Sequence, residues 1–145
     1  MEHLNNLKEE EIENIVYSTE AKDNSYKILV TQLQEKEMPG GYKSGGHIFM
    51  VKGGKVIKDI KIPCDGLSCS ISPDKNFFGL TTMGPEWGVY YFNKEGILIW
   101  KKILDKRIGC VEIKENYIVL YDKIHEETRK KIMELNLKGE IVKNN

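Results

Sequence analysis

Residues 47–60 read His-Ile-Phe-Met-Val-Lys-Gly-Gly-Lys-Val-Ile-Lys-Asp-Ile, and the same pattern returns twice further along the chain. Residues 89–103 read Val-Tyr-Tyr-Phe-Asn-Lys-Glu-Gly-Ile-Leu-Ile-Trp-Lys-Lys-Ile, and residues 132–143 read Ile-Met-Glu-Leu-Asn-Leu-Lys-Gly-Glu-Ile-Val-Lys. Each window has an apolar or aromatic run, a polar turn with glycine and a second apolar run, which is typical of a β-hairpin. The turn glycines are 42 and 43 residues apart, and glycine adopts a positive φ angle at little cost. They are Gly54, Gly96 and Gly139.

A second pair of short strands precedes each hairpin, and its turn is rich in residues that favour turns. The strand pairs cover residues 14–19 with 26–31, 69–72 with 77–82, and 111–114 with 117–121. We therefore predict an all-β fold of three four-stranded antiparallel β-meander repeats, each about 43 residues long. The repeats span approximately residues 13–62, 63–104 and 105–145 of a single domain, and residues 1–12 form a short N-terminal helix or tail.

The unit from Cys69 to Trp100 resembles a β-propeller blade of the broad WD-repeat and quinoprotein-like kind. A Ser-Pro-Asp turn that begins at Ser72 and the hairpin from Asn93 to Trp100 carry this resemblance, although the Gly-His and Trp-Asp pairs are missing. Three blades are fewer than the four to eight that close a ring. The resemblance therefore implies half of a six-bladed ring that a second copy completes, as a homodimer, or an open stack of blades. A fold closed on itself as a sandwich or small barrel is the alternative.

Composition and charge limit the class of protein and its partners. The chain has 145 residues, which suits one domain, and its 22 Lys and Arg balance its 22 Asp and Glu. This balance argues against a nucleic-acid partner, and no apolar stretch approaches the ~18 residues that a membrane span needs. The N-terminus lacks the pattern of a secretory leader, and three cysteines are an odd number, so we expect reduced thiols and a cytoplasmic location.

No motif for catalysis, a metal or a cofactor is complete, and we predict none of the three. The sequence His125-Glu-Glu-Thr-Arg129 begins like a zinc-protease helix, but Arg129 replaces the second histidine ligand. The glycine-rich residues 40–46 fail the P-loop order, because Gly46 stands where lysine is needed. The cysteines form no Cys-x-x-Cys pair, and we expect Cys64, Cys69 and Cys110 to be small buried side chains.

Strand order predicts where a binding site lies. In a four-stranded meander the second-to-third connections and the connections between units emerge on one side of the sheets. The longer connections share this side, and long loops on a rigid β scaffold are common recognition sites. They are residues 34–46, 63–68, 83–88, 105–109 and 123–131. We expect Trp87 in a turn-rich loop without a strand partner, where it signals binding. The predicted binding residues are Tyr42, Asp65, Glu86, Trp87, Arg107 and His125.

The resulting expectation is a non-catalytic β-repeat scaffold that binds a protein partner through its loop face. The alternative is a small-molecule or carbohydrate-binding protein, or a lyase or hydrolase, with a site at the mouth of an oligomeric propeller. A purely structural half-propeller is a third possibility. The acid–base candidates of such an enzyme are His47, His125, Glu86 and Asp65. A deep pocket in which His47 or His125 meets a carboxylate favours the enzyme, and a flat surface with exposed Trp87 and no perturbed acid favours the binding protein.

Overall fold

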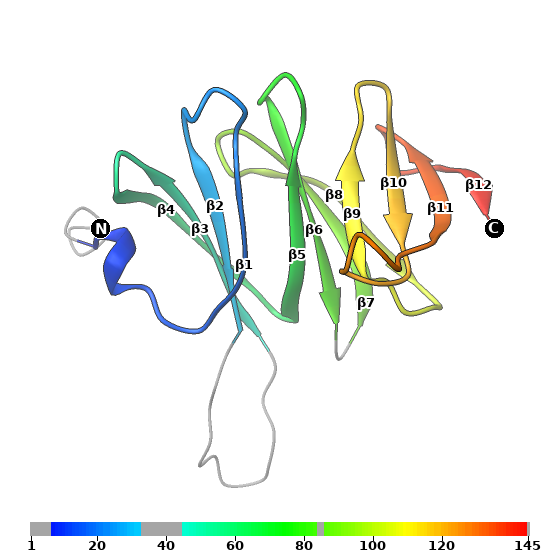
Figure 1. Ribbon diagram of the computed structural model, residues 1–145, viewed down its shortest axis with the longest axis horizontal. Helices are drawn as coiled ribbons and strands as arrows, with labels where there is room; N and C mark the ends of the chain where they lie inside the picture. The colour runs from blue at the N-terminus through cyan, green and yellow to red at the C-terminus, as the bar shows by residue number, and fades with distance from the viewer. Residues whose placement is uncertain (1–6, 33–44, 84–85, 145) are drawn as a thin grey trace, which may run out of the picture.

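The computed structural model describes residues 7–32, 45–83 and 86–144, which form three four-stranded antiparallel sheets (Figure 1). The first sheet contains β1 (Ile15–Glu20), β2 (Lys27–Thr31), β3 (Gly46–Lys52) and β4 (Lys55–Ile62). The second contains β5 (Asp65–Ile71), β6 (Phe77–Met83), β7 (Trp87–Asn93) and β8 (Leu98–Leu104). The third contains β9 (Cys110–Ile113), β10 (Tyr117–Tyr121), β11 (Lys131–Asn136) and β12 (Ile141–Asn144). Each sheet is a meander in chain order, and none closes into a barrel within the described residues, so the predicted fold class is confirmed.

The three glycines used to align the repeats lie in equivalent hairpin turns. Gly54, Gly96 and Gly139 have φ angles of 78°, 81° and 86°, a region that side chains with a Cβ atom rarely adopt. In the second and third sheets an asparagine closes the turn, because its backbone carbonyl oxygen accepts a hydrogen bond from the glycine N–H. The bonds join Asn93 to Gly96 at 2.9 Å and Asn136 to Gly139 at 3.0 Å. The regular spacing of these glycines in the sequence therefore reflects a turn in each repeat that needs a positive φ angle.

The sheets pack face to face around two apolar cores, and the second sheet contributes to both. Its strand β7 alternates across the pleat, so Tyr90 and Phe92 enter the core shared with the first sheet. Val89 and Tyr91 point the other way, into the core shared with the third sheet. The aromatic run from Tyr90 to Phe92 therefore packs between sheets on both faces of β7. Other fully buried side chains are Ile28, Ile48, Phe78 and Leu80 in the first core and Ile108, Ile118, Leu120 and Leu135 in the second.

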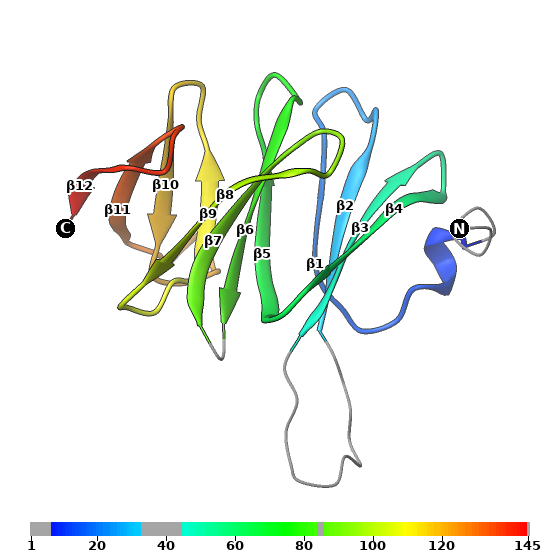
Figure 2. The ribbon, with the colours of Figure 1, turned by 180° about the vertical axis from the view of Figure 1, so that it is seen from behind.

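The sheets stand in chain order along the long axis of the molecule, and β1, β5 and β9 lie side by side (Figures 1 and 2). The tight turns within each strand pair emerge on one side, which we call the turn side. The connections β4–β5, β8–β9 and β10–β11 emerge on the opposite side, which we call the loop side. This arrangement agrees with the expectation drawn from strand order.

An N-terminal segment covers the outer face of the first sheet. Residues 7–14, which we call the strap, include one 3₁₀ turn, η1 (Glu9–Glu11). Leu7 and Ile12 pack on an apolar cluster of that face, which contains Leu29, Phe49, Val51 and Val56. The strap also pairs with the edge of β4, because Val56 N–H donates to Leu7 O at 3.1 Å and Glu9 N–H donates to Gly54 O at 2.9 Å. Of residues 1–12, which we predicted to form a short helix or tail, the described residues 7–12 form a packed segment with a single 3₁₀ turn.

Two stretches that we expected to be loops form strands instead. Trp87 is the first residue of β7 and pairs with Leu104 of β8, so the expectation of a tryptophan without a strand partner is wrong. Residues 65–68 form the first part of β5 instead of a connection. Gly66 there is not a turn residue, because a Cβ atom at this position would clash with the Val30 side chain of the first sheet. This glycine permits the close approach of two sheets.

Candidate functional site

A cleft of about 490 Å³ opens on the loop side between the second and third sheets. It brings together three of the residues predicted from sequence, each from a different element. Trp87 comes from the start of β7, Arg107 from the β8–β9 connection and His125 from the β10–β11 connection. The other residues of this loop-side cleft are Leu67, Met83, Ile108, Gly109, Asp122, Lys123 and Ile124.

Trp87 and Arg107 form one wall of the cleft, where an aromatic ring lies beside a cationic side chain. The guanidinium carbon of Arg107 lies 5.4 Å from the centroid of the Trp87 ring, within range of a cation–π interaction. Arg107 is exposed and Trp87 is partly exposed, so both side chains are accessible from solvent. Large aromatic and arginine side chains are the residues most often responsible for binding energy at protein interfaces.

Hydrogen bonds hold the β10–β11 connection, which carries His125, at its base and at its tip. At its base, Asp122 Oδ1 accepts a hydrogen bond from Lys130 N–H at 2.7 Å, and Asp122 N–H donates to Lys130 O at 3.0 Å. At its tip, His125 O accepts hydrogen bonds from Thr128 N–H at 3.2 Å and Arg129 N–H at 3.0 Å. These hydrogen bonds fix the conformation of the connection, which forms one wall of the cleft.

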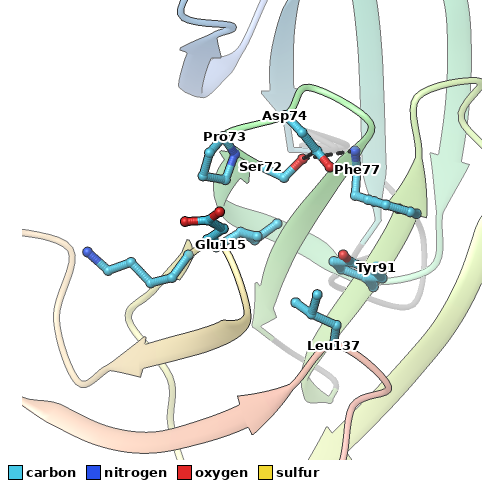
Figure 3. Close-up of a pocket in the computed structure, with 9 residues that line it drawn as sticks. Ser72, Pro73, Asp74, Phe77, Tyr91, Glu115 and Leu137 are labelled. Atoms are coloured by element: carbon cyan, nitrogen blue, oxygen red, sulfur yellow. Dashed lines mark hydrogen bonds between the residues drawn. The ribbon is translucent and has the colours of Figure 1, made fainter.

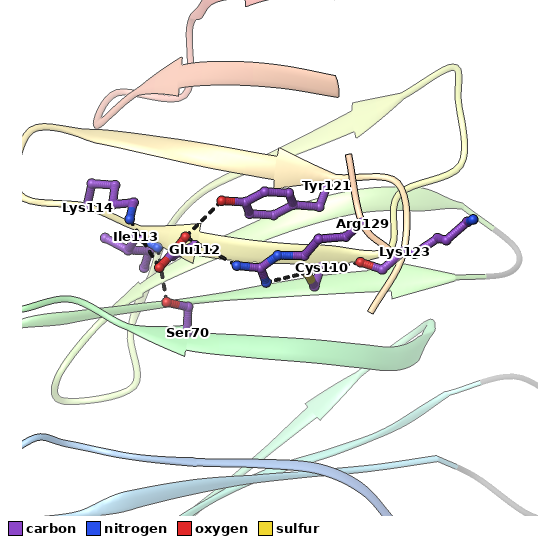
Figure 4. A network of polar contacts seen from close by, with 8 residues as sticks. All are labelled: Ser70, Cys110, Glu112, Ile113, Lys114, Tyr121, Lys123 and Arg129. Atoms are coloured by element: carbon purple, nitrogen blue, oxygen red, sulfur yellow. Dashed lines mark hydrogen bonds and ion pairs between the residues drawn. The ribbon is translucent and has the colours of Figure 1, made fainter. Parts of the chain in front are cut away.

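A polar network on the face of the third sheet opposite to the second core anchors the same connection (Figure 4). The guanidinium carbon of Arg129 lies 3.8 Å from the centroid of the Tyr121 ring, and Nη1 donates to Cys110 Sγ at 3.3 Å. Arg129 Nη2 also lies 3.6 Å from Glu112 Oε1, to which the Tyr121 hydroxyl donates at 2.9 Å. The Cys110 thiol in turn donates to Lys123 O at 3.2 Å, which fixes the start of the connection.

The charge states within this network follow from burial and hydrogen bonding. Burial raises the pKa of the Cys110 thiol, and the nearby Arg129 guanidinium offsets this only in part. Cys110 is therefore a neutral thiol, as its donated hydrogen bond requires. Burial alone favours neutral Glu112, but the hydrogen bond from Tyr121 and the ammonium of Lys114 lower the pKa of Glu112 below its usual value. The carboxylate therefore stays ionised beside Arg129.

A glycine allows the β8–β9 connection to pass close to the β10–β11 connection. A Cβ atom on Gly109 would clash with the backbone of Lys123. Gly109 N–H donates a hydrogen bond to Tyr121 O at 2.7 Å, which holds the two connections together. The two segments that bear Arg107 and His125 are therefore fixed against each other.

The remaining sequence-predicted residues lie elsewhere. Asp65 is buried at the start of β5, where its Oδ1 accepts a hydrogen bond from Gly45 N–H at 3.0 Å, and it does not line the cleft. Glu86 is exposed next to Trp87, and its backbone oxygen accepts a hydrogen bond from the Thr82 hydroxyl at 3.1 Å. Tyr42 lies outside the described residues.

The sequence did not single out the apolar floor of the cleft or two of its polar residues, Asp122 and Lys123. Leu67, Met83 and Ile108 all fall within segments that we had placed on the loop face. The sequence therefore predicted the segments that form the cleft but not the individual apolar residues. An apolar residue next to a strand does not indicate which sheet it will contact.

A histidine meets a carboxylate at a second place, on the outer face of the first sheet. His47 Nδ1 lies 2.6 Å from Asp59 Oδ1, and the His47 ring stacks on Phe49 with centroids 5.3 Å apart. His47 and Phe49 line a hollow of about 320 Å³ between this sheet and the strap. Asp59 does not line this open hollow, so the pair is not the deep pocket with a histidine and a carboxylate that we named as favouring an enzyme. It also lies apart from the loop-side cleft.

All three cysteines are free and buried, as expected from sequence. Within residues 7–32, 45–83 and 86–144, no three His, Cys, Asp or Glu side chains gather in a metal-binding arrangement. The same residues include no helix with the length and apolar character to cross a bilayer.

Comparison with known proteins gives little further information. No family model matches the chain, and no curated protein matches it. Among solved structures, it is similar to the crystal structure of a functionally unknown protein from Desulfotomaculum acetoxidans DSM 771, with 13% sequence identity and a TM-score of 0.30. The match covers 83% of this chain and 55% of that one, so this chain spans little more than half the length of that structure.

Proposed function

We propose that the protein is a non-catalytic β-repeat scaffold that binds a protein partner through the loop-side cleft. The observation that carries this proposal is the convergence of Trp87, Arg107 and His125, from three separate elements, on one cleft of about 490 Å³. A rigid β framework with such a surface suits recognition, since its connections are held by hydrogen bonds and need little ordering on binding.

The cleft favours an acidic partner segment that carries an apolar side chain. Arg107 and Lys123 are cationic residues at its rim, while the one carboxylate among its described lining residues, on Asp122, already accepts a hydrogen bond from Lys130 N–H. The floor offers the apolar side chains of Leu67, Met83, Ile108 and Ile124. Because the whole chain has a formal net charge of zero, attraction for an acidic segment is local to this surface.

The test compares partner binding by the wild-type protein and two cleft variants, Trp87→Ala and Arg107→Glu. Partners are recovered from native lysate by cross-linking, and the affinity of each is then measured with purified proteins. We expect either substitution to weaken a true cleft partner by about 30-fold or more, because central aromatic and arginine side chains contribute about 2 kcal/mol or more.

Matched control variants carry similar changes on the turn side, namely Tyr117→Ala and Lys94→Glu, both at exposed positions. These controls should retain wild-type affinity, and all four variants should keep the wild-type melting temperature to within a few degrees. A partner that binds both cleft variants as tightly as it binds the wild-type protein would contradict the proposal.

We further propose that the sheets are propeller-like blades and that two copies associate in the cytoplasm. The side-by-side placement of β1, β5 and β9 supports blade-like stacking, and exposed apolar residues on β8 and β12 support association. A closed six-sheet ring, however, needs the outer face of the first sheet free, and Leu7 and Ile12 of the strap pack there. Ring closure therefore requires the strap to leave this face.

A second candidate function is small-molecule binding at the hollow between the first sheet and the strap, which His47 lines. The Asp59 carboxylate beside His47 Nδ1 fixes the orientation of the imidazole, and an oriented histidine is a common acid–base group. A library of sugars and small metabolites is screened for compounds that raise the melting temperature. A true ligand should stabilise the wild-type and His125→Asn proteins by several degrees but not His47→Asn. Equal stabilisation of all three proteins would eliminate this site.

A further inference from the structure

A second pocket, on the turn side, combines aromatic rings with carboxylates. It measures about 410 Å³ and opens between the second and third sheets, beside the β5–β6 and β9–β10 turns (Figure 3). Phe77, Tyr91, Ile113 and Leu137 provide its apolar surface. Tyr91 is stacked between Phe77 and Trp100, with ring centroids 5.3 Å and 5.0 Å apart, so Phe77 ends the stack and keeps one ring face that no other ring of the described residues covers.

Two carboxylates, one from each turn, stand at the pocket. Figure 3 shows Asp74 and Glu115 on one side of the view and Tyr91 and Leu137 on the other. The Ser72 hydroxyl donates to Asp74 Oδ1 at 2.6 Å, and Asn76 N–H donates to the same oxygen at 3.0 Å. These hydrogen bonds, that from Ser72 first, lower the pKa of Asp74, so the group is anionic at neutral pH.

The cationic residue that lines this pocket is engaged elsewhere. Lys114 borders the pocket, but its ammonium lies 3.2 Å from Glu112 Oε2, on the opposite face of the sheet from Ile113. Among the described residues, Asp74 and Glu115 form no ion pair, so the negative charge at the pocket is not balanced.

Tyr91 provides an independent indication that a ligand belongs here. The residue is only 3% exposed, yet it lines the pocket, and its hydroxyl has no hydrogen-bond partner among the described residues. Burial, and then the charge of Asp74, raise the pKa of Tyr91 to about 12, so the hydroxyl is neutral and available as an acceptor or donor.

We propose that the turn-side pocket binds an arginine side chain of a partner protein. A guanidinium group is flat and stacks on aromatic rings, and its five N–H donors suit two carboxylates that approach from different turns. Phe77 supplies the aromatic face, and Asp74, Glu115 and the Tyr91 hydroxyl supply the acceptors. This inference is independent of the loop-side cleft, which lies at the other end of the same sheets and is itself basic.

The experiment is an NMR titration of the ¹⁵N-labelled full chain with the peptide acetyl-Gly-Arg-Gly-amide. The matched control peptide replaces arginine with citrulline, which has nearly the same shape but no charge. We expect saturable shifts of backbone amides in residues 72–77 and 113–116 with the arginine peptide, and at least tenfold weaker binding of the citrulline peptide.

Variants of the protein complete the test. The double variant Asp74→Asn with Glu115→Gln keeps the oxygen that closes the β5–β6 turn but removes both charges, and it should weaken the arginine peptide about tenfold. The control Glu127→Gln removes an exposed charge on the loop side and should leave binding unchanged. Equal binding of the citrulline peptide, or undiminished arginine binding by a folded double variant, would overturn the proposal.

Discussion

Replacing Phe78 with alanine is expected to lower the free energy of unfolding by about 3–5 kcal/mol. Phe78 is 0% exposed in the core between the first and second sheets, and its ring stacks on Phe92 with centroids 4.9 Å apart. Truncation removes this contact and leaves a cavity that rigid strands on both sides cannot fill. Because domains of this size are stable by about 5–15 kcal/mol, the variant should lose a large part of its stability.

Urea unfolding followed by tryptophan fluorescence and circular dichroism measures this change. The control is Tyr117→Ala on β10, where the side chain is 37% exposed and the expected loss is below about 1 kcal/mol. Equal losses in the two variants would show that the first core is not as tightly packed as described.

The double substitution Leu7→Asp with Ile12→Asp is expected to release the strap and uncover the outer face of the first sheet. We expect a loss of about 2–4 kcal/mol, since two partly buried apolar side chains become charged and the cluster around Phe49 becomes exposed. If two copies close a ring, the uncovered face also becomes available, and the variant should dimerise more strongly than the wild-type chain.

Thermal unfolding and light scattering at micromolar concentration test both effects in the same samples. Glu10→Ala, at an exposed position of the strap, is the control and should resemble the wild-type protein. Unchanged stability in the double variant would contradict the packing of the strap. A strictly monomeric mass for both the wild-type protein and the double variant would rule out the two-fold ring.

The repeat was readable from sequence because it depends on local chemistry. A hairpin turn that requires a positive φ angle favours glycine, so the spacing of Gly96 and Gly139 was enough to predict two equivalent turns. One of the residues that misled us has its decisive neighbour in another repeat. Gly66 resembles a turn residue, yet its role is to let Val30 of the preceding sheet approach. A single sequence contains no sign of such contact.

For the candidate sites too, local patterns could be read from the sequence, whereas contacts between repeats could not. Strand order alone placed Trp87, Arg107 and His125 on one side of the molecule, and they line one cleft. The turn-side pocket escaped notice because its two carboxylates belong to tight turns of different repeats, each unremarkable alone. The strap escaped for a related reason, since the charged run from Lys8 to Glu11 hid the two apolar residues that flank it.

The placement of the second sheet in both cores has a consequence for folding cooperativity. Each end sheet buries one face against a neighbouring sheet, whereas the second sheet buries both. In an array of this kind stability is carried by nearest-neighbour interfaces, and local unfolding begins at the ends. An end repeat can therefore open while the other interface persists, but loss of the middle repeat removes both interfaces at once. The middle repeat is thus the one whose unfolding disrupts both apolar cores.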